Sequence, residues 1–215
     1  METTHSKNSG EERFDVAKIF RRETWCIGES AFAVLLLLIG TSMLDGFYGS
    51  YYNLNQLVFD AFDAPVSIIG IFFGASYAVN ATAYIAADFF SSRFGKRNTM
   101  LGSMLIEAGL FMILPWFASN PLCLFGLSMA LCFLPEVVYI TSENLIQDAI
   151  ADDLRATVLS VASLVRTLFS AMFFSIFGYV LGLYPIQIAL GVIGAIAIAI
   201  TAVVSLKMVG IHVSK

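Results

Sequence analysis

The run AVLLLLI at residues 33–39 decides the fold class, because seven consecutive apolar residues stand there without a polar interruption. The apolar segment around this run extends from about Ile27 to Tyr51, which is longer than the roughly 20 residues that a helix needs to cross a bilayer. Five further segments of similar character follow, at Pro65 to Phe89, Thr99 to Phe117, Pro121 to Ile146, Ala156 to Leu183 and Pro185 to Met208. The sequence therefore predicts an all-α membrane protein with six transmembrane helices.

The composition of the 215-residue chain supports this prediction. Hydrophobic residues make up 58% of the chain and charged residues only 13%, whereas a soluble domain carries about 25% charged residues. The mean hydropathy is +0.81. The net charge of −4 argues against nucleic acid as a partner, since such binding needs a basic surface. A surface with so few charges suits contact with a lipid bilayer.

Cysteine and histidine placement predicts neither a metal site nor a cofactor. The cysteines have no C-x-x-C spacing and lie in or beside apolar segments, at Cys26, Cys123 and Cys132. His5 and His212 lie near the chain ends, so no predicted span supplies an imidazole ligand. The nucleophile-elbow, zinc-protease and P-loop motifs are also absent from the sequence. We therefore expect that the protein is not an enzyme and holds no metal or cofactor.

Basic residues alternate between the connections of the six spans. Of the twelve Lys and Arg residues, five precede the first span, three lie between spans two and three, one lies between spans four and five, and two lie at the C-terminal end. The other connections carry none, and the remaining basic residue, Arg166, lies inside span five. By the positive-inside rule, both termini are expected to be cytoplasmic. Residues 1–22 are then a cytoplasmic leader or linker, and residues 23–215 form the six-span domain in a plasma or inner membrane.

Polar and ionisable residues within the predicted spans are the candidates for function, because they are costly to place in lipid. Those that we expect to bind substrate or a coupling ion are Asp45, Asn80, Glu107, Glu136 and Arg166. Asp45 precedes a tyrosine-rich segment that we assign to the extracellular end of span one, either as a binding wall or as an interfacial aromatic belt. The pairs Gly70/Gly74 and Gly178/Gly182 predict close helix packing.

Arg166 requires a partner, because it lies about ten residues into the fifth span, at a depth of roughly 15 Å. The fourth span runs toward the same side of the membrane and carries Glu136, beside Pro135, and Glu143. We expect Arg166 to pair with one of these two carboxylates. Such a pair is either a substrate or proton-coupling group or an ion pair that holds two helices together, and the sequence leaves both interpretations open.

Two connecting segments resemble the major facilitator superfamily. The segment SSRFGKR at residues 91–97 resembles its cytoplasmic motif G-x-x-x-D-R-x-G-R-[RK], with matches at Arg93, Gly95, Lys96 and Arg97. Asp88 stands at the first glycine position of that motif, and Ser92 stands at its aspartate position. The segment DDLRATVLS at residues 152–160 is similar to the cytoplasmic loop before the eleventh span of many members.

This resemblance implies the C-terminal six-helix half of a secondary transporter, built from two inverted three-helix repeats. It implies transport of a small solute by alternating access, at a site shared with a second six-span half or a homodimer partner. It also implies a conformational latch at Asp88, Arg93, Gly95, Lys96, Arg97, Glu143 and Arg155.

In this latch, Arg93 and Lys96 are expected to hold the ends of spans two to four together, through Asp88 or Glu143. Topology anchoring by positive charge alone is the other interpretation of these basic residues. For the chain as a whole, the alternative function is a non-transporting or orphaned regulatory half. An intramembrane enzyme or channel is a third alternative, and no motif supports it.

Overall fold

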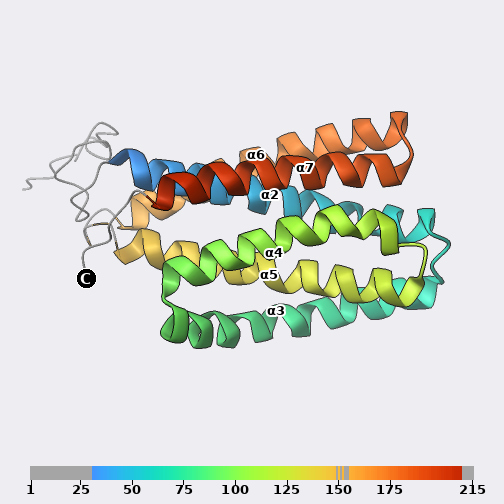
Figure 1. Cartoon of the computed structure of the whole chain (residues 1–215), viewed down its shortest axis with the longest axis horizontal. Helices are drawn as coiled ribbons and strands as arrows, with labels where there is room; N and C mark the ends of the chain where they lie inside the picture. Colours follow the sequence, from blue (N-terminus) through green and yellow to red (C-terminus); the bar gives the residue numbers. More distant parts are fainter. Residues whose placement is uncertain (1–30, 149, 151, 153–154, 210–215) are drawn as a thin grey trace, which may run out of the picture.

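The computed structural model describes residues 31–148, 150, 152 and 155–209, and its elements are six helices (Figure 1). They are α2 (Ala31–Ala61), α3 (Val66–Phe94), α4 (Lys96–Phe117), α5 (Pro121–Asp148), α6 (Arg155–Leu183) and α7 (Ile186–Val209). Five of them, α3 to α7, are long and apolar enough to cross a membrane. The predicted all-helical, multi-pass architecture is confirmed to this extent, while a membrane-crossing α2 stays a prediction. The predicted leader at residues 1–22 lies outside the described residues.

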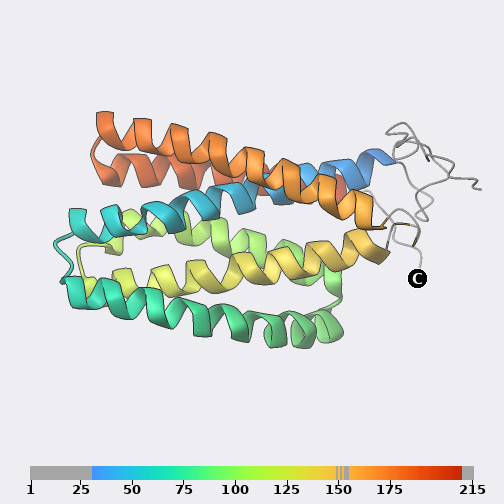
Figure 2. The ribbon, with the colours of Figure 1, turned by 180° about the vertical axis from the view of Figure 1, so that it is seen from behind.

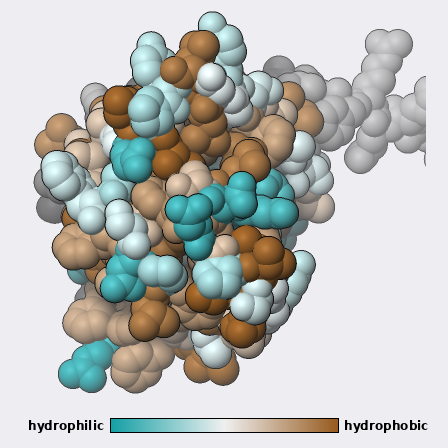
Figure 3. Space-filling view, turned by 90° about the vertical axis from the view of Figure 1, so that its right-hand side faces the viewer, coloured by the Kyte–Doolittle hydropathy of each residue, from teal (hydrophilic) through white to brown (hydrophobic). Residues whose placement is uncertain are grey.

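Successive helices run in opposite directions along the bundle (Figure 1). The α3–α4 and α5–α6 connections therefore lie at the same end as the start of α2 and the end of α7. We call this the basic end, because Arg93, Lys96, Arg97 and Arg155 are located there. Figure 3 looks onto the opposite end, where hydrophilic side chains gather over the middle and apolar side chains surround them. Exposed polar residues at that end include Asp60, Asp63 and Asn120.

Short connections between the helices follow from their turn-forming residues. Gly95 alone separates α3 from α4 and has φ of 83°, a left-handed conformation that glycine adopts without strain. The Asn120 side-chain oxygen accepts hydrogen bonds from the backbone N–H groups of Leu122 (3.0 Å) and Cys123 (3.3 Å) at the start of α5. Pro185 stands immediately before α7. The predicted boundaries between spans three and four and between spans five and six are thus confirmed.

The first helix differs from its predicted bounds. It was expected to end near Tyr51, but α2 continues to Ala61. Its second half is held by packing, since Tyr51, Val58 and Phe59 are fully buried. The Tyr51 hydroxyl also lies 2.7 Å from the Ser128 hydroxyl of α5. Asp45 is therefore in the middle of the helix, and its predicted place at the extracellular end is wrong.

Helix packing follows a regular pattern. Helix α2 packs against α5, α6 and α7, α4 packs against α3, α5 and α7, and the other main pairs are α3 with α5 and α6 with α7. Exchanging α2, α3 and α4 for α5, α6 and α7 converts each of these pairs either into itself or into another pair of the same set. The exchanged helices run in opposite directions (Figure 1).

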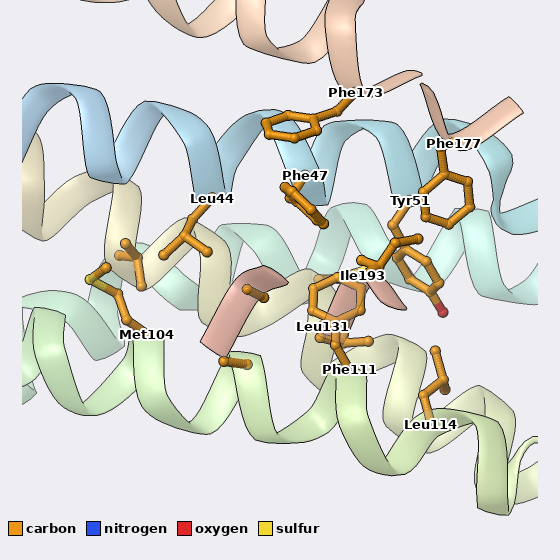
Figure 4. Packing of buried hydrophobic residues seen from close by; sticks show 14 of the residues in the cluster. Leu44, Phe47, Tyr51, Met104, Phe111, Leu114, Leu131, Phe173, Phe177 and Ile193 are labelled. Carbon is orange, nitrogen blue, oxygen red and sulfur yellow. The ribbon is translucent and has the colours of Figure 1, made fainter. Parts of the chain in front are cut away.

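The arrangement gives the bundle two different broad faces. Helices α4 and α7 lie toward the viewer in Figure 1, whereas α6, α2, α5 and α3 lie side by side in the view from behind in Figure 2. We call this second side the four-helix face. Between the two faces, apolar side chains of five helices interlock, as Figure 4 shows for Leu44, Phe47, Phe111, Leu131, Phe173 and Ile193. The Phe47 and Phe173 rings have centroids 4.2 Å apart.

Close helix approach occurs at glycines other than the predicted ones. A Cβ atom at Gly46 of α2 would lie 2.9 Å from the backbone of Phe169 in α6, so this crossing requires glycine. The predicted pairs Gly70/Gly74 and Gly178/Gly182 have no heavy atom within 4 Å of such a Cβ position. Their predicted role in packing within this chain is wrong, because their faces of α3 and α6 point away from the other described helices.

Candidate functional site

Arg166 of α6 is the centre of a charged cluster inside the bundle. Its Nε lies 3.2 Å from Oδ2 of Asp45 in α2, and its Nη1 lies 3.5 Å from Oε1 of Glu143 in α5. The Arg166 side chain is only 15% exposed. Of the two predicted partners, Glu143 is confirmed and Glu136 is not, and Asp45 is a second partner that the sequence did not indicate. One guanidinium group thus connects three helices.

An aromatic ring supports the same guanidinium group. The Cζ atom of Arg166 lies 4.2 Å from the centre of the Tyr139 ring in α5, which is within the range of a cation–π interaction. Tyr139 and Glu143 are one helical turn apart, so they approach Arg166 from the same face of α5. This spacing is the signal that could have identified Tyr139 from the sequence.

Glu107 of α4 borders the cluster but is not paired. Its side chain is 1% exposed, and neither carboxyl oxygen has a hydrogen-bond partner among the described residues. A small cavity of about 10 Å³ lies between Glu107, Asp45 and Arg166, close to the ~10–15 Å³ that one water molecule requires. Its other walls are Thr41, Leu44, Pro135, Val138, Tyr139 and Ser142. Three of the five predicted binding or coupling residues therefore meet at one cavity.

The other two predicted binding residues lie outside the ion pairs of the cluster. Glu136 is half-buried and forms none of the ion pairs among the described residues. In the amide orientation that its neighbours favour, the Asn80 nitrogen donates to the carbonyl oxygens of Cys132 (3.1 Å) and Ser76 (3.2 Å). The Asn80 amide therefore links α3 to α5, just before Pro135 inside α5.

An open groove connects the cluster to the four-helix face. The groove has a volume of about 450 Å³ and lies between α3 and α5, toward the basic end. Its polar lining residues are Tyr84, Asp88, Tyr139, Glu143 and Asn144. Because Tyr139 and Glu143 also contact Arg166, the groove adjoins the charged cluster directly. The volume falls within the roughly 300–1,000 Å³ of small-molecule sites.

A second group of ion pairs joins helices at the basic end. The Lys96 Nζ at the start of α4 lies 2.5 Å from Oδ2 of Asp148 at the end of α5. Arg155 at the start of α6 bonds Asp152 at 2.8 Å and donates to the Gln147 carbonyl oxygen at 3.3 Å. Lys96 thus ties α4 to α5 as expected of the latch, although its partner is neither Asp88 nor Glu143.

The remaining latch residues have other surroundings. Asp88 is exposed and lines the groove, and Gly95 provides the turn between α3 and α4. Arg93 is exposed, and its Cζ lies 5.9 Å from the centre of the adjacent Phe94 ring. Arg97 is half-buried in the first turn of α4. The structure thus places Asp88 and Arg93 outside the ion pairs of the described residues, which differs from the predicted latch.

No protein-family model matches the chain, and no curated protein matches it.

Proposed function

We propose that this chain is a six-helix half of a secondary transporter of the major facilitator type, which moves a small solute across a membrane by alternating access. The observation that carries the proposal is the Arg166 cluster. It places a cation and three carboxyl groups between α2 and three helices, α4 to α6, that are long and apolar enough to cross a membrane. Asp45 and Glu107 lie halfway along α2 and α4. Ionisable residues at such positions normally serve substrate or ion pathways.

The packing pattern supports the same proposal. Transporters of this type contain three-helix repeats of inverted topology, with the binding site near the bilayer midplane. The exchange of α2–α4 for α5–α7 preserves the main helix contacts and reverses helix direction. Such a pattern is expected of an inverted repeat.

The four-helix face supports the proposal that a second six-helix half binds this chain. Helices α3 and α6 flank this face, and their glycine pairs at Gly70/Gly74 and Gly178/Gly182 have open space beside them. The groove beside Glu143 opens on this face as well. We propose that a second six-helix half, or a second copy of this chain, covers the face and encloses the groove. The basic end then faces the cytoplasm, where its cations match the positive-inside rule.

Uptake measurements in proteoliposomes test the proposal. The chain is reconstituted alone and together with a candidate second half, and labelled small solutes are offered under imposed ion gradients. We expect saturable uptake that Arg166→Gln abolishes, because the substitution removes the charge at the centre of the cluster. Leu168→Ala, on an exposed position of the same helix, is the matched control and should retain uptake.

The alternative function is that of a non-transporting regulatory half. Absence of uptake in both reconstitutions, with Arg166→Gln affecting only folding, would favour a structural cluster and reject the transport proposal. Crosslinking between cysteines placed at Gly74 or Gly178 and a partner then reports whether the four-helix face is covered at all.

A further inference from the structure

We propose that Glu107 is a proton-binding site, and that its carboxyl group is protonated in the conformation described here. The site itself rests on geometry alone, whereas its use as the coupling site of transport rests on the proposed function. Glu107 was a candidate from the sequence only because it is ionisable and lies within a predicted span. The structure adds three observations: its carboxyl group has no hydrogen-bond partner among the described residues, its neighbours are known, and the cavity beside it has a known size.

The isolation of Glu107 is the first observation. Both carboxyl oxygens are buried without a hydrogen-bond partner among the described residues. Burying an ionised carboxylate without a partner is far more costly than burying the neutral acid. Because the side chain is 1% exposed within the bundle itself, its neighbours are protein atoms whatever surrounds the helices. The neutral, protonated form therefore suits this position.

The charges around Glu107 are the second observation. Asp45 of α2 and Arg166 of α6 line the same cavity, together with Tyr139 of α5. Arg166 is engaged by Asp45 and by Glu143 of α5, so one cation already faces two carboxylates. An ionised Glu107 would add a third carboxylate.

The other helices that pack against α4 do not change this balance. Helix α7 has no Asp, Glu, Lys, Arg or His between Ile186 and Leu206, and α3 contributes no residue to the cavity. Glu136 of α5 is a further carboxyl group, half-buried and outside the cavity. Apart from the paired Arg166, the charged neighbours named here among the described residues are carboxyl groups, which favour a proton on Glu107 rather than a negative charge.

The size of the cavity selects the ligand. Its volume of about 10 Å³ accommodates at most a water molecule, so an organic solute does not fit beside Glu107. No group of three or more His, Cys, Asp or Glu residues in the described part of the chain is arranged to hold a metal ion. A proton needs neither volume nor a ligand shell.

Proton exchange can be written as a balanced step. When the cavity opens to water, the O–H bond of Glu107 breaks and the proton passes to a water molecule, giving a carboxylate and a hydronium ion. The new carboxylate then competes with Asp45 for the guanidinium group of Arg166 across the cavity. Reprotonation from water on the other side reverses the step. The ion pair between α2 and α6 thereby becomes sensitive to the proton on α4.

Infrared spectroscopy of the purified full chain tests the proton site without any transport. At neutral pH, the wild-type protein should show the carbonyl stretch of a protonated carboxylic acid. Glu107→Gln should lose this band, and Glu136→Gln, the matched control on α5, should keep it. Raising the pH should remove the band from the wild-type protein together with release of one proton per chain, measured with a pH-sensitive dye.

Several outcomes would overturn the proposal. They are the absence of the band from the wild-type protein at neutral pH, its survival in Glu107→Gln, or its loss in Glu136→Gln. A sodium-dependent rise of the melting temperature that potassium does not produce, together with no protonated band, would identify a sodium site instead. If Glu107→Gln does not fold, wild-type protein with isotope-labelled glutamate carboxyl groups replaces it, and a band that does not shift contradicts the proposal.

The infrared measurement, combined with the uptake measurement, separates this inference from the transport proposal. A band that behaves as expected in a protein without measurable uptake leaves the proton site in place and rejects only transport. Uptake that is unaffected by an imposed pH gradient, with the band present, rejects coupling through Glu107 but not the bound proton. Absence of the band from a wild-type protein whose uptake is intact and independent of pH rejects the proton site and leaves transport in place.

Discussion

The Arg166 cluster and the ion pairs at the basic end both join a basic side chain to carboxylates, but in different surroundings. Arg166 is 15% exposed and contacts Asp45, Glu143 and the Tyr139 ring. Lys96 and Asp148 are 39% and 60% exposed and contact each other at the ends of their helices. An exposed pair contributes about 0–1 kcal/mol, whereas breaking a buried pair costs about 3–5 kcal/mol. The comparison indicates that the cluster resists opening, while the pair at the basic end breaks at little cost in free energy.

The largest expected effect is that of Arg166→Ala. Asp45 and Glu143 would lose their shared cation, and we expect the free energy of unfolding to fall by about 3 kcal/mol, at the lower end for buried pairs because Arg166 is not fully buried. Thermal or denaturant unfolding in detergent measures this change. Adding Asp45→Asn and Glu143→Gln to the variant should restore part of the loss. An unchanged unfolding midpoint would show that the cluster does not hold the helices together.

The next effect concerns the crossing of α2 and α6, which brings Asp45 to Arg166. Gly46→Ala would place a Cβ 2.9 Å from the Phe169 backbone, and we expect it to destabilise the protein by about 1–3 kcal/mol through overpacking. The matched control is Gly70→Ala on α3, which has open space. It should be neutral or stabilising by up to about 1 kcal/mol, because alanine favours the helix. Equal effects of the two variants would contradict the described crossing.

A smaller effect separates the aromatic contact from the ion pairs of the cluster. Tyr139→Leu removes the ring beside Arg166 and should cost about 1 kcal/mol, as expected for a partly desolvated cation–π interaction. Tyr139→Phe keeps the ring and should retain most of the stability. Unfolding measurements on both variants test this expectation. A loss that is as large in Tyr139→Phe as in Tyr139→Leu would assign the contribution to the hydroxyl group instead.

The smallest effect on stability is expected at the basic end. Lys96→Ala should lower the free energy of unfolding by less than about 1 kcal/mol, because the pair with Asp148 is exposed. The loss should shrink further in high salt, which screens exposed charges. The charge-reversed double variant Lys96→Asp with Asp148→Lys should recover the wild-type value in low salt. A salt-independent loss as large as that of Arg166→Ala would remove the distinction between the two regions.

Several features of the fold could be predicted because they depend on local chemistry. Apolar segments of membrane-crossing length predict helices, and five of the six satisfy this criterion in the structure. The connections at Gly95, Asn120 and Pro185 follow from backbone conformations that these residue types favour. The need of Arg166 for a carboxylate follows from the cost of a lone charge in a span. Glu143, on the preceding helix in the sequence, was therefore within reach of prediction.

Other features depended on the rotation and register of each helix, which a nearly uniform apolar sequence leaves open. Asp45 is far from Arg166 in sequence and becomes its partner only because Gly46 lets α2 approach α6. Glu107 and Glu136 are equally ionisable, yet packing isolates the first and leaves the second half-buried. The sequence by itself determined the helical class and the need for charge compensation. The tertiary structure alone decided which carboxyl groups are paired and which is isolated, because contacts between distant helices set the local charge and burial.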